Sequence, residues 1–102
     1  MASSVDINKI SDGAKLVVSV SGRVDSTTAP QFEEEIKSSI EGVTELVIDF
    51  KELEYISSAG LRVLLSTQKT MMKQGSMVIK NVSEEVMDVF EVTGFVDMLT
   101  IE

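Results

Sequence analysis

The chain has 102 residues, a formal net charge of −8 at pH 7, and neither cysteine nor histidine. The lack of these two residue types excludes disulfides, thiolate nucleophiles, imidazole bases and nearly all zinc, copper and haem sites. The negative charge would repel a phosphate backbone or an anionic lipid surface, so we expect no direct binding to nucleic acid or membrane. With 43% hydrophobic and 25% charged residues, the composition predicts one globular domain over residues 1–102.

Targeting and cofactor motifs are missing from the sequence. Residues 1–6 lack the basic region and apolar run of a signal peptide, and no apolar stretch reaches the length of a membrane-spanning helix. There is no glycine-rich phosphate loop, dinucleotide fingerprint or carboxylate-rich metal motif. We therefore expect a cytoplasmic protein without a cofactor or a metal.

The first part of the chain predicts a hairpin followed by a helix. Residues 5–10 alternate weakly between polar and apolar, Gly13 follows in a turn, and residues 15–21 are rich in β-branched side chains. A helix should begin near residue 28, because Pro30 fits a first helical turn, and should end at Gly42. Its inward face is predicted from four apolar residues at helical spacing: Ala29, Phe32, Ile36 and Ile40.

The middle of the chain predicts a buried strand and a long amphipathic helix. Residues 46–50 form a short, nearly continuous apolar run, which is typical of a strand covered on both faces. The following helix should end at Gly75. Its predicted buried face consists of Leu61, Leu64, Leu65 and Met72.

The last part predicts a strand over residues 77–79, a third helix and a final strand over residues 98–101. In that helix Val86, Val89 and Phe90 should point inward, and Gly94 should end it. The element order is therefore β-β-α-β-α-β-α-β. It predicts an α/β fold with a mixed sheet of about five strands packed with three or more helices, since each strand–helix–strand crossover requires parallel strands.

Two hydroxyl groups, those of Ser57 and Ser58, stand at the predicted start of the second helix. The free amides and positive dipole of a helix N-terminus would stabilise a phosphate on Ser58, and the added charge could break an interface. The simpler interpretation is that a serine here caps the helix. The sequence argues against a serine hydrolase, because the nucleophile-elbow glycines and a histidine base are missing.

Two aspartates lie near the ends of predicted strands. Asp49 could be a phospho-accepting residue of a receiver domain, but residues 5–13 hold no acidic pair for magnesium, so we expect it to satisfy backbone groups of the next loop. Asp25 lies in the segment Gly22-Arg23-Val24-Asp25, and it could cap the loop or point at a partner.

The order and spacing of several segments resemble the STAS domain, the family of the bacterial anti-sigma factor antagonists. The resemblance is carried by residues 46–50, the run Tyr55-Ile56-Ser57-Ser58-Ala59-Gly60-Leu61-Arg62-Val63-Leu64 and the turn at residues 22–25. Gly75, Phe90 and Thr93-Gly94-Phe95 add to it. At Ser57 this chain departs from the family, which usually has aspartate there.

The resemblance implies a protein-binding switch without enzymatic activity. In the family a serine that matches Ser58 is phosphorylated by the anti-sigma factor, which is itself a serine kinase. The unphosphorylated antagonist binds that kinase and frees the sigma factor, and a separate phosphatase restores the unphosphorylated form. Ser57 is the second choice of acceptor. The expected partner-binding residues lie on one rim beside the first two helices: Asp25, Ser26, Ser57, Ser58, Gly60, Leu61 and Arg62.

Another branch of the STAS family implies a different role. STAS domains also occur as constitutive subunits of larger assemblies such as lipid ABC transporters, in which Ser57 and Ser58 would be helix caps. The family's antagonists are mostly monomers, which favours a monomer here. An edge strand at residues 5–10 could nevertheless pair with another chain.

Overall fold

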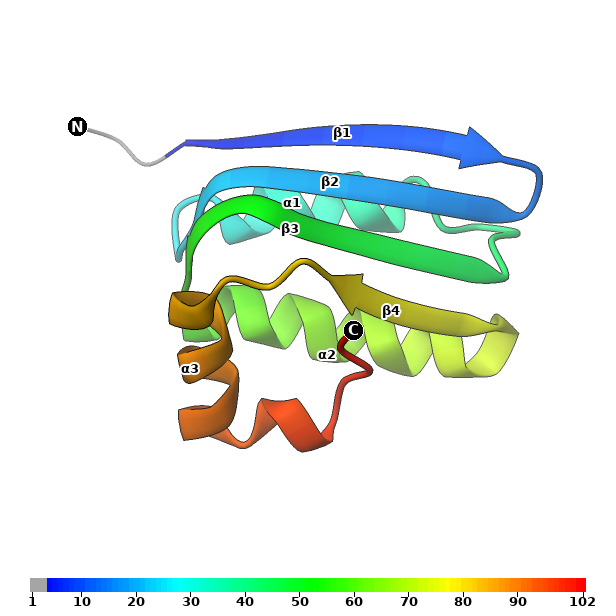
Figure 1. The fold of residues 1–102 in the computed structure, drawn as a ribbon. Helices are drawn as coiled ribbons and strands as arrows, with labels where there is room; N and C mark the ends of the chain where they lie inside the picture. The colour runs from blue at the N-terminus through cyan, green and yellow to red at the C-terminus, as the bar shows by residue number, and fades with distance from the viewer. Residues whose placement is uncertain (1–3) are drawn as a thin grey trace.

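The computed structural model describes residues 4–102, in which four strands form one sheet (Figure 1). Residues 1–3 lie outside the described part; they belong to the N-terminal segment that lacks the features of a signal peptide. The elements follow in the order β1 (Val5–Asp12), β2 (Lys15–Val24), α1 (Ala29–Lys37), β3 (Glu45–Ile56), α2 (Ser58–Gln74), β4 (Ser76–Lys80), α3 (Glu84–Thr93) and a 3-10 helix, η1 (Phe95–Asp97). No helix in this part of the chain is both long and apolar enough to cross a membrane.

The sheet is mixed, as predicted, with the strand order β1-β2-β3-β4. β1 and β2 form an antiparallel hairpin, and β2, β3 and β4 run parallel to one another. α1 connects β2 to β3 and α2 connects β3 to β4, so each helix serves as a crossover between parallel strands. Both helices lie behind the sheet in Figure 1. The carboxyl ends of β2 and β3 therefore meet at the edge where α1 and α2 begin.

α1 starts where the sequence predicts, but it is shorter than expected. Its inward residues Ala29, Phe32 and Ile36 are buried, which confirms the predicted face. The helix ends at Lys37 and not at Gly42, because the hydroxyls of Ser38 and Ser39 donate hydrogen bonds back to the carbonyl of Glu35 and the chain turns away. Ile40 is still buried, from the connection that follows the helix.

α2 packs through a stripe in which Leu61, Leu64 and Met71 are fully buried. The prediction that Met72 belongs to this stripe is wrong, since 72% of its surface is exposed. Met71 continues the line of Leu64 at the i+7 position, and Met72 is therefore rotated towards solvent. Leu65 is partly exposed for the same reason.

β3 is longer and less covered than its sequence suggests. The pairing of β2 with β3 shifts register twice, at Ser19/Ser21 and at Gly22/Arg23, and these irregularities hide the second half of the strand from a pattern of alternation. The expectation of a strand covered on both faces is wrong. Helices cover one face, and on the other Val47 is shielded mainly by its in-register neighbours Val17 and Val78.

The C-terminal helix is as predicted, whereas the last strand is reduced to one bridge. Val86 and Phe90 are buried, and Gly94 ends α3 with a positive φ of 80°. Val89 is partly buried against the same core. The predicted strand at residues 98–101 consists of a single parallel bridge between Ile79 and Ile101, because the preceding residues wind into η1 and its closing turn.

We predict that Gly75→Ala strongly destabilises the fold. A Cβ at Gly75 would clash with the carbonyl oxygen of Thr44, to which Ser76 donates a backbone hydrogen bond of 2.9 Å. Relieving such a backbone clash should cost about 1–3 kcal/mol or more. Urea unfolding followed by circular dichroism measures this loss, with Ser76→Ala on the exposed neighbour as the control. Equal stability of the two variants would contradict the packing described here.

Candidate functional site

The site begins where β3 passes into α2. The amide of Ser57 donates a 2.8 Å hydrogen bond to the carbonyl of Val24, which ties the end of β3 to the end of β2. Ser57 has extended backbone angles, and its carbonyl accepts the first helical bond of α2, a 3.0 Å bond from the amide of Leu61. Because Asp25 follows Val24 and Ser58 follows Ser57, this one bond brings the β2–α1 and β3–α2 connections side by side.

Gly60 and Leu61 hold the start of α2 against the sheet. Both residues are buried. A Cβ on Gly60 would come within 2.6 Å of Val24 Cγ1 and 2.7 Å of Ile56 Cγ1, so the helix can approach this closely because residue 60 has no side chain. The two residues therefore face the core and position the exposed ones beside them.

The two adjacent serines lie in different environments. Ser58, the first residue of α2, is exposed. The hydroxyl oxygen of Ser57 is buried and has no hydrogen-bond partner among residues 4–102. Within the same range neither hydroxyl forms the capping bond that a serine at a helix start usually makes, so the capping expectation is wrong for this helix. Ser57 is the N-cap residue by backbone conformation only.

Asp25 supports the neighbouring loop. Its Oδ1 accepts hydrogen bonds from the amide of Thr27 at 2.9 Å, from the hydroxyl of Thr27 at 2.7 Å and from the amide of Thr28 at 3.2 Å. The Thr28 hydroxyl accepts from the amide of Asp25 and donates to the carbonyl of Arg23. Asp25 thus fixes the turn into α1, the first of the two roles that the sequence left open, and Ser26 lies exposed at the tip of that turn.

A groove of about 450 Å³ runs between the first turns of α1 and α2. Small or short side chains form much of its lining, and Glu33 and Arg62 contribute opposite charges from the two helices. Its lining residues are Ser26, Ala29, Pro30, Glu33, Ala59, Arg62, Val63 and Ser66. The groove joins two of the predicted rim residues, Ser26 and Arg62, with Ala59, the residue after Ser58, in one concave surface.

An aromatic–cation pair flanks the junction from the other side of the sheet. The guanidinium carbon of Arg23 lies 4.4 Å from the ring centroid of Tyr55, and the two residues are paired in register on β2 and β3. The sequence analysis did not single out this pair. The register shift at Gly22/Arg23 brings the two residues together, and sequence alternation gives no signal for it.

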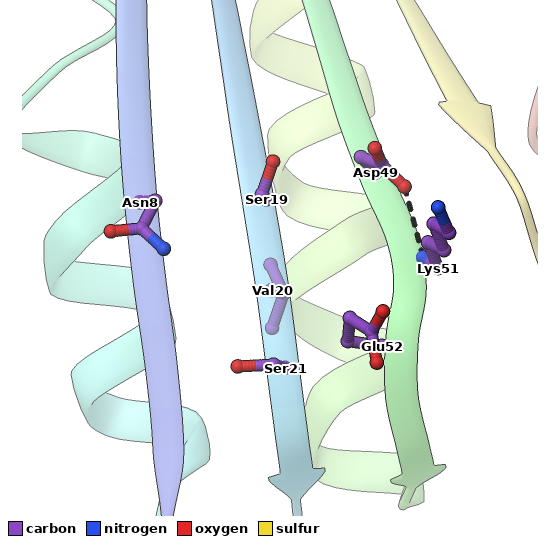
Figure 2. A pocket seen from close by; sticks show the side chains of 7 residues that line it. All are labelled: Asn8, Ser19, Val20, Ser21, Asp49, Lys51 and Glu52. Carbon is purple, nitrogen blue, oxygen red and sulfur yellow. Dashed lines mark hydrogen bonds between the residues drawn. The ribbon is translucent and has the colours of Figure 1, made fainter.

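The uncovered face of the sheet has a separate hollow of about 250 Å³ around Asp49 (Figure 2). The Oδ1 atom of Asp49 accepts hydrogen bonds from the amide of Lys51 at 2.9 Å and from Nδ2 of Asn81 at 3.0 Å. Asp49 therefore accepts from the backbone, as the sequence analysis expected, but its partner Lys51 lies within β3 and not in a loop, because the strand continues to Ile56. The interpretation as a receiver-type acceptor gains no support. Its neighbours in the hollow include Ser19, Ser21 and Glu52.

The predicted rim residues lie in two layers at this junction. Among residues 4–102 no group of three His, Cys, Asp or Glu side chains gathers in a way that could hold a metal ion. Three of the predicted rim residues are exposed: Ser26, Ser58 and Arg62. Asp25 supports the loop that carries Ser26. Ser57, Gly60 and Leu61 lie beneath it.

Comparison with known proteins identifies the family. Residues 6–102 match the family model of the STAS domain, so the chain belongs to the STAS domain family. The anti-sigma-B factor antagonist of Bacillus subtilis is 34% identical over 85 residues, which cover 82% of this chain and 78% of that protein. The sequence resemblance to the STAS family is thereby confirmed.

Solved structures share the fold. An anti-sigma factor antagonist from Mycobacterium paratuberculosis superimposes with a TM-score of 0.87 at 26% identity, covering 96% of this chain and 85% of the other. The antagonist SpoIIAA in its unphosphorylated form gives a TM-score of 0.79 at 20% identity, covering 97% and 88% of the two chains. A structure of SpoIIAA in its phosphorylated form gives 0.72 at 19% identity, covering 97% and 91%.

We predict that Asp25→Ala destabilises the domain by about 1–2 kcal/mol, because it removes the acceptor that closes the turn into α1. Glu34→Ala is the control: Glu34 is exposed on α1 and its loss changes the charge equally. Thermal and urea unfolding of the two variants measure the difference. If both variants unfold like the unmodified protein, the loop does not depend on the Asp25 carboxylate.

Proposed function

We propose that this protein is an anti-sigma factor antagonist. In its unphosphorylated form it binds an anti-sigma factor of the serine-kinase type and releases the sigma factor, and phosphorylation of Ser58 ends that binding. The proposal rests on one observation: of two adjacent serines at the start of α2, Ser58 is exposed and the hydroxyl oxygen of Ser57 is buried. A kinase active site needs access to the attacking hydroxyl, which favours Ser58 as the acceptor.

The relatives support the regulatory part of the proposal. The Bacillus subtilis relative is an anti-sigma-B factor antagonist, and SpoIIAA has been solved with and without its phosphate. The absence of cysteine and histidine from the sequence also favours a binding role over catalysis. A serine phosphatase would complete the cycle by restoring the free hydroxyl.

The physical effect of the modification follows from its position. A phosphate adds a charge of about −1.5 to −2 to a surface side chain at neutral pH. On Ser58 it would stand one residue before Ala59, which lines the groove between α1 and α2, and one helical turn from Arg62. There a partner's contacts would be disrupted by repulsion and by the cost of burying a charge. The fold itself need not change, because Ser58 faces solvent.

The alternative role as a constitutive subunit of a transporter assembly draws no support from the serines, since neither of them forms a cap bond within residues 4–102. Isolation of the protein from its native cells separates the two functions. Exchange between the protein and a soluble kinase supports the antagonist, whereas co-purification with a membrane ATPase supports the subunit.

We predict that Ser58→Asp weakens binding to the anti-sigma factor by about tenfold or more, since a charge placed in an interface typically costs over 1 kcal/mol. The measurement is a competition assay, in which the protein displaces a labelled sigma factor from the anti-sigma factor. Ser58→Ala is the matched control and should displace sigma factor as the unmodified protein does. Both variants should keep the unmodified thermal midpoint. Equal displacement by Ser58→Asp would refute the charge switch.

A further inference from the structure

The charge of α2 is opposite to that of the rest of the molecule. Its 17 residues contain Arg62, Lys69 and Lys73 and no carboxylate, which gives a formal charge of +3 in a chain of net charge −8. The other two α-helices described in residues 4–102 are acidic: α1 carries three glutamates against one lysine, and α3 carries four acids and no base. The positive charge of α2 is thus a local feature set against an acidic background.

These basic side chains share the solvent face of the helix. Arg62, Lys69 and Lys73 are all exposed, and with Ser58 they follow the i, i+4 and i+7 spacings of one helical stripe. Met72 is exposed and Leu65 partly exposed within the same stripe. We name this surface the α2 face, defined as Ser58, Arg62, Leu65, Lys69, Met72 and Lys73.

The three basic side chains of the α2 face form no ion pairs within the described part of the molecule. Four other lysines of residues 4–102 pair with glutamates, at 2.9–3.8 Å, and Arg23 stacks on Tyr55. No ion pair of Arg62, Lys69 or Lys73 forms with a carboxylate in the same range. Their charge is therefore available to a binding partner along the whole length of the helix.

We infer that the α2 face docks on an acidic surface of the anti-sigma factor, with Leu65 and Met72 in apolar contact between the basic side chains. The inference rests on the proposed function and extends its interface from the Ser58 rim to the far end of α2. The inference is based on charge complementarity. A row of unpaired cations that flanks two apolar side chains fits a protein groove rimmed by carboxylates.

The α2 face also explains how one phosphate could be sufficient to end binding. Phosphate on Ser58 would cancel about half or more of the +3 charge, since it adds about −1.5 to −2. Arg62 lies one turn further along, at the i+4 position, where side chains of a helix meet. Its guanidinium would pair with the phosphate and be withdrawn from the partner.

The first test uses an acidic probe that does not depend on knowing the partner. The ¹⁵N-labelled protein is titrated with a 20-residue poly-glutamate peptide at low salt, and amide shifts are followed by NMR. We expect shifts concentrated on the α2 face despite the net charge of −8, and their loss in the Lys69→Glu/Lys73→Glu variant. Shifts spread over the molecule, or none, would overturn the inference.

The second test measures binding to the serine-kinase anti-sigma factor of the same organism at two salt concentrations. Lys69→Glu/Lys73→Glu should raise Kd by about tenfold and flatten its salt dependence. The single reversals Lys69→Glu and Lys73→Glu are compared with Lys51→Glu, which changes the net charge equally and should leave Kd nearly unchanged. Lys51 is an exposed lysine without an ion pair in residues 4–102 and lies on β3 by the hollow of the uncovered sheet face (Figure 2).

The outcomes separate the inference from the proposed function. If Ser58→Asp weakens binding and the lysine reversals do not, the antagonist function stands and the α2 face is not its interface. If the unmodified protein does not bind the anti-sigma factor, the proposed function fails. The peptide titration still shows whether the α2 face binds an acidic peptide. Two other results would overturn the inference. If the protein binds phosphatidylglycerol vesicles and the lysine reversals abolish that binding, the α2 face is a membrane surface. If the protein self-associates and the reversals abolish that, the face binds a second copy.

Discussion

The hydrogen bond from the Ser57 amide to the Val24 carbonyl is the constraint on which the site depends. It joins the carboxyl ends of two parallel strands, and the helices that follow those strands begin from that point. Gly60 then allows α2 to pack on Val24 and Ile56 at a distance that any side chain would prevent. Of the two neighbouring serines at this junction, Ser57 has a buried hydroxyl oxygen and Ser58 is exposed.

The same geometry explains why stability and function can be separated in this domain. Residues beneath the rim, such as Gly60 and Leu61, belong to the core, and changes there act on the fold. Ser58 and Arg62 are exposed, so changes there act on what the surface presents. A switch that works by adding charge to an exposed side chain needs no second conformation of the protein, because the charge itself alters the affinity.

Much of this fold follows from sequence patterns, and the exceptions have physical causes. Element order, the mixed sheet and the inward faces of α1 and α3 follow from periodicity, turn residues and the geometry of crossovers. Two register shifts conceal the second half of β3, and backward hydrogen bonds from serines shorten α1. These local hydrogen bonds and register shifts leave no periodic signal in the sequence. The sequence likewise gives no sign that the serines at the start of α2 make no capping bond.

The candidate site was predicted less from chemistry than from resemblance. Composition excluded thiol and imidazole catalysis and nearly all zinc, copper and haem sites, but the distinction between Ser57 and Ser58 depends on burial, which the sequence cannot supply. The most direct test is fragmentation mass spectrometry of the protein after incubation with ATP and the serine-kinase anti-sigma factor of its own organism. The account predicts one added phosphate, located on Ser58. Phosphate on Ser57, or none with an anti-sigma factor that binds the protein, would contradict it.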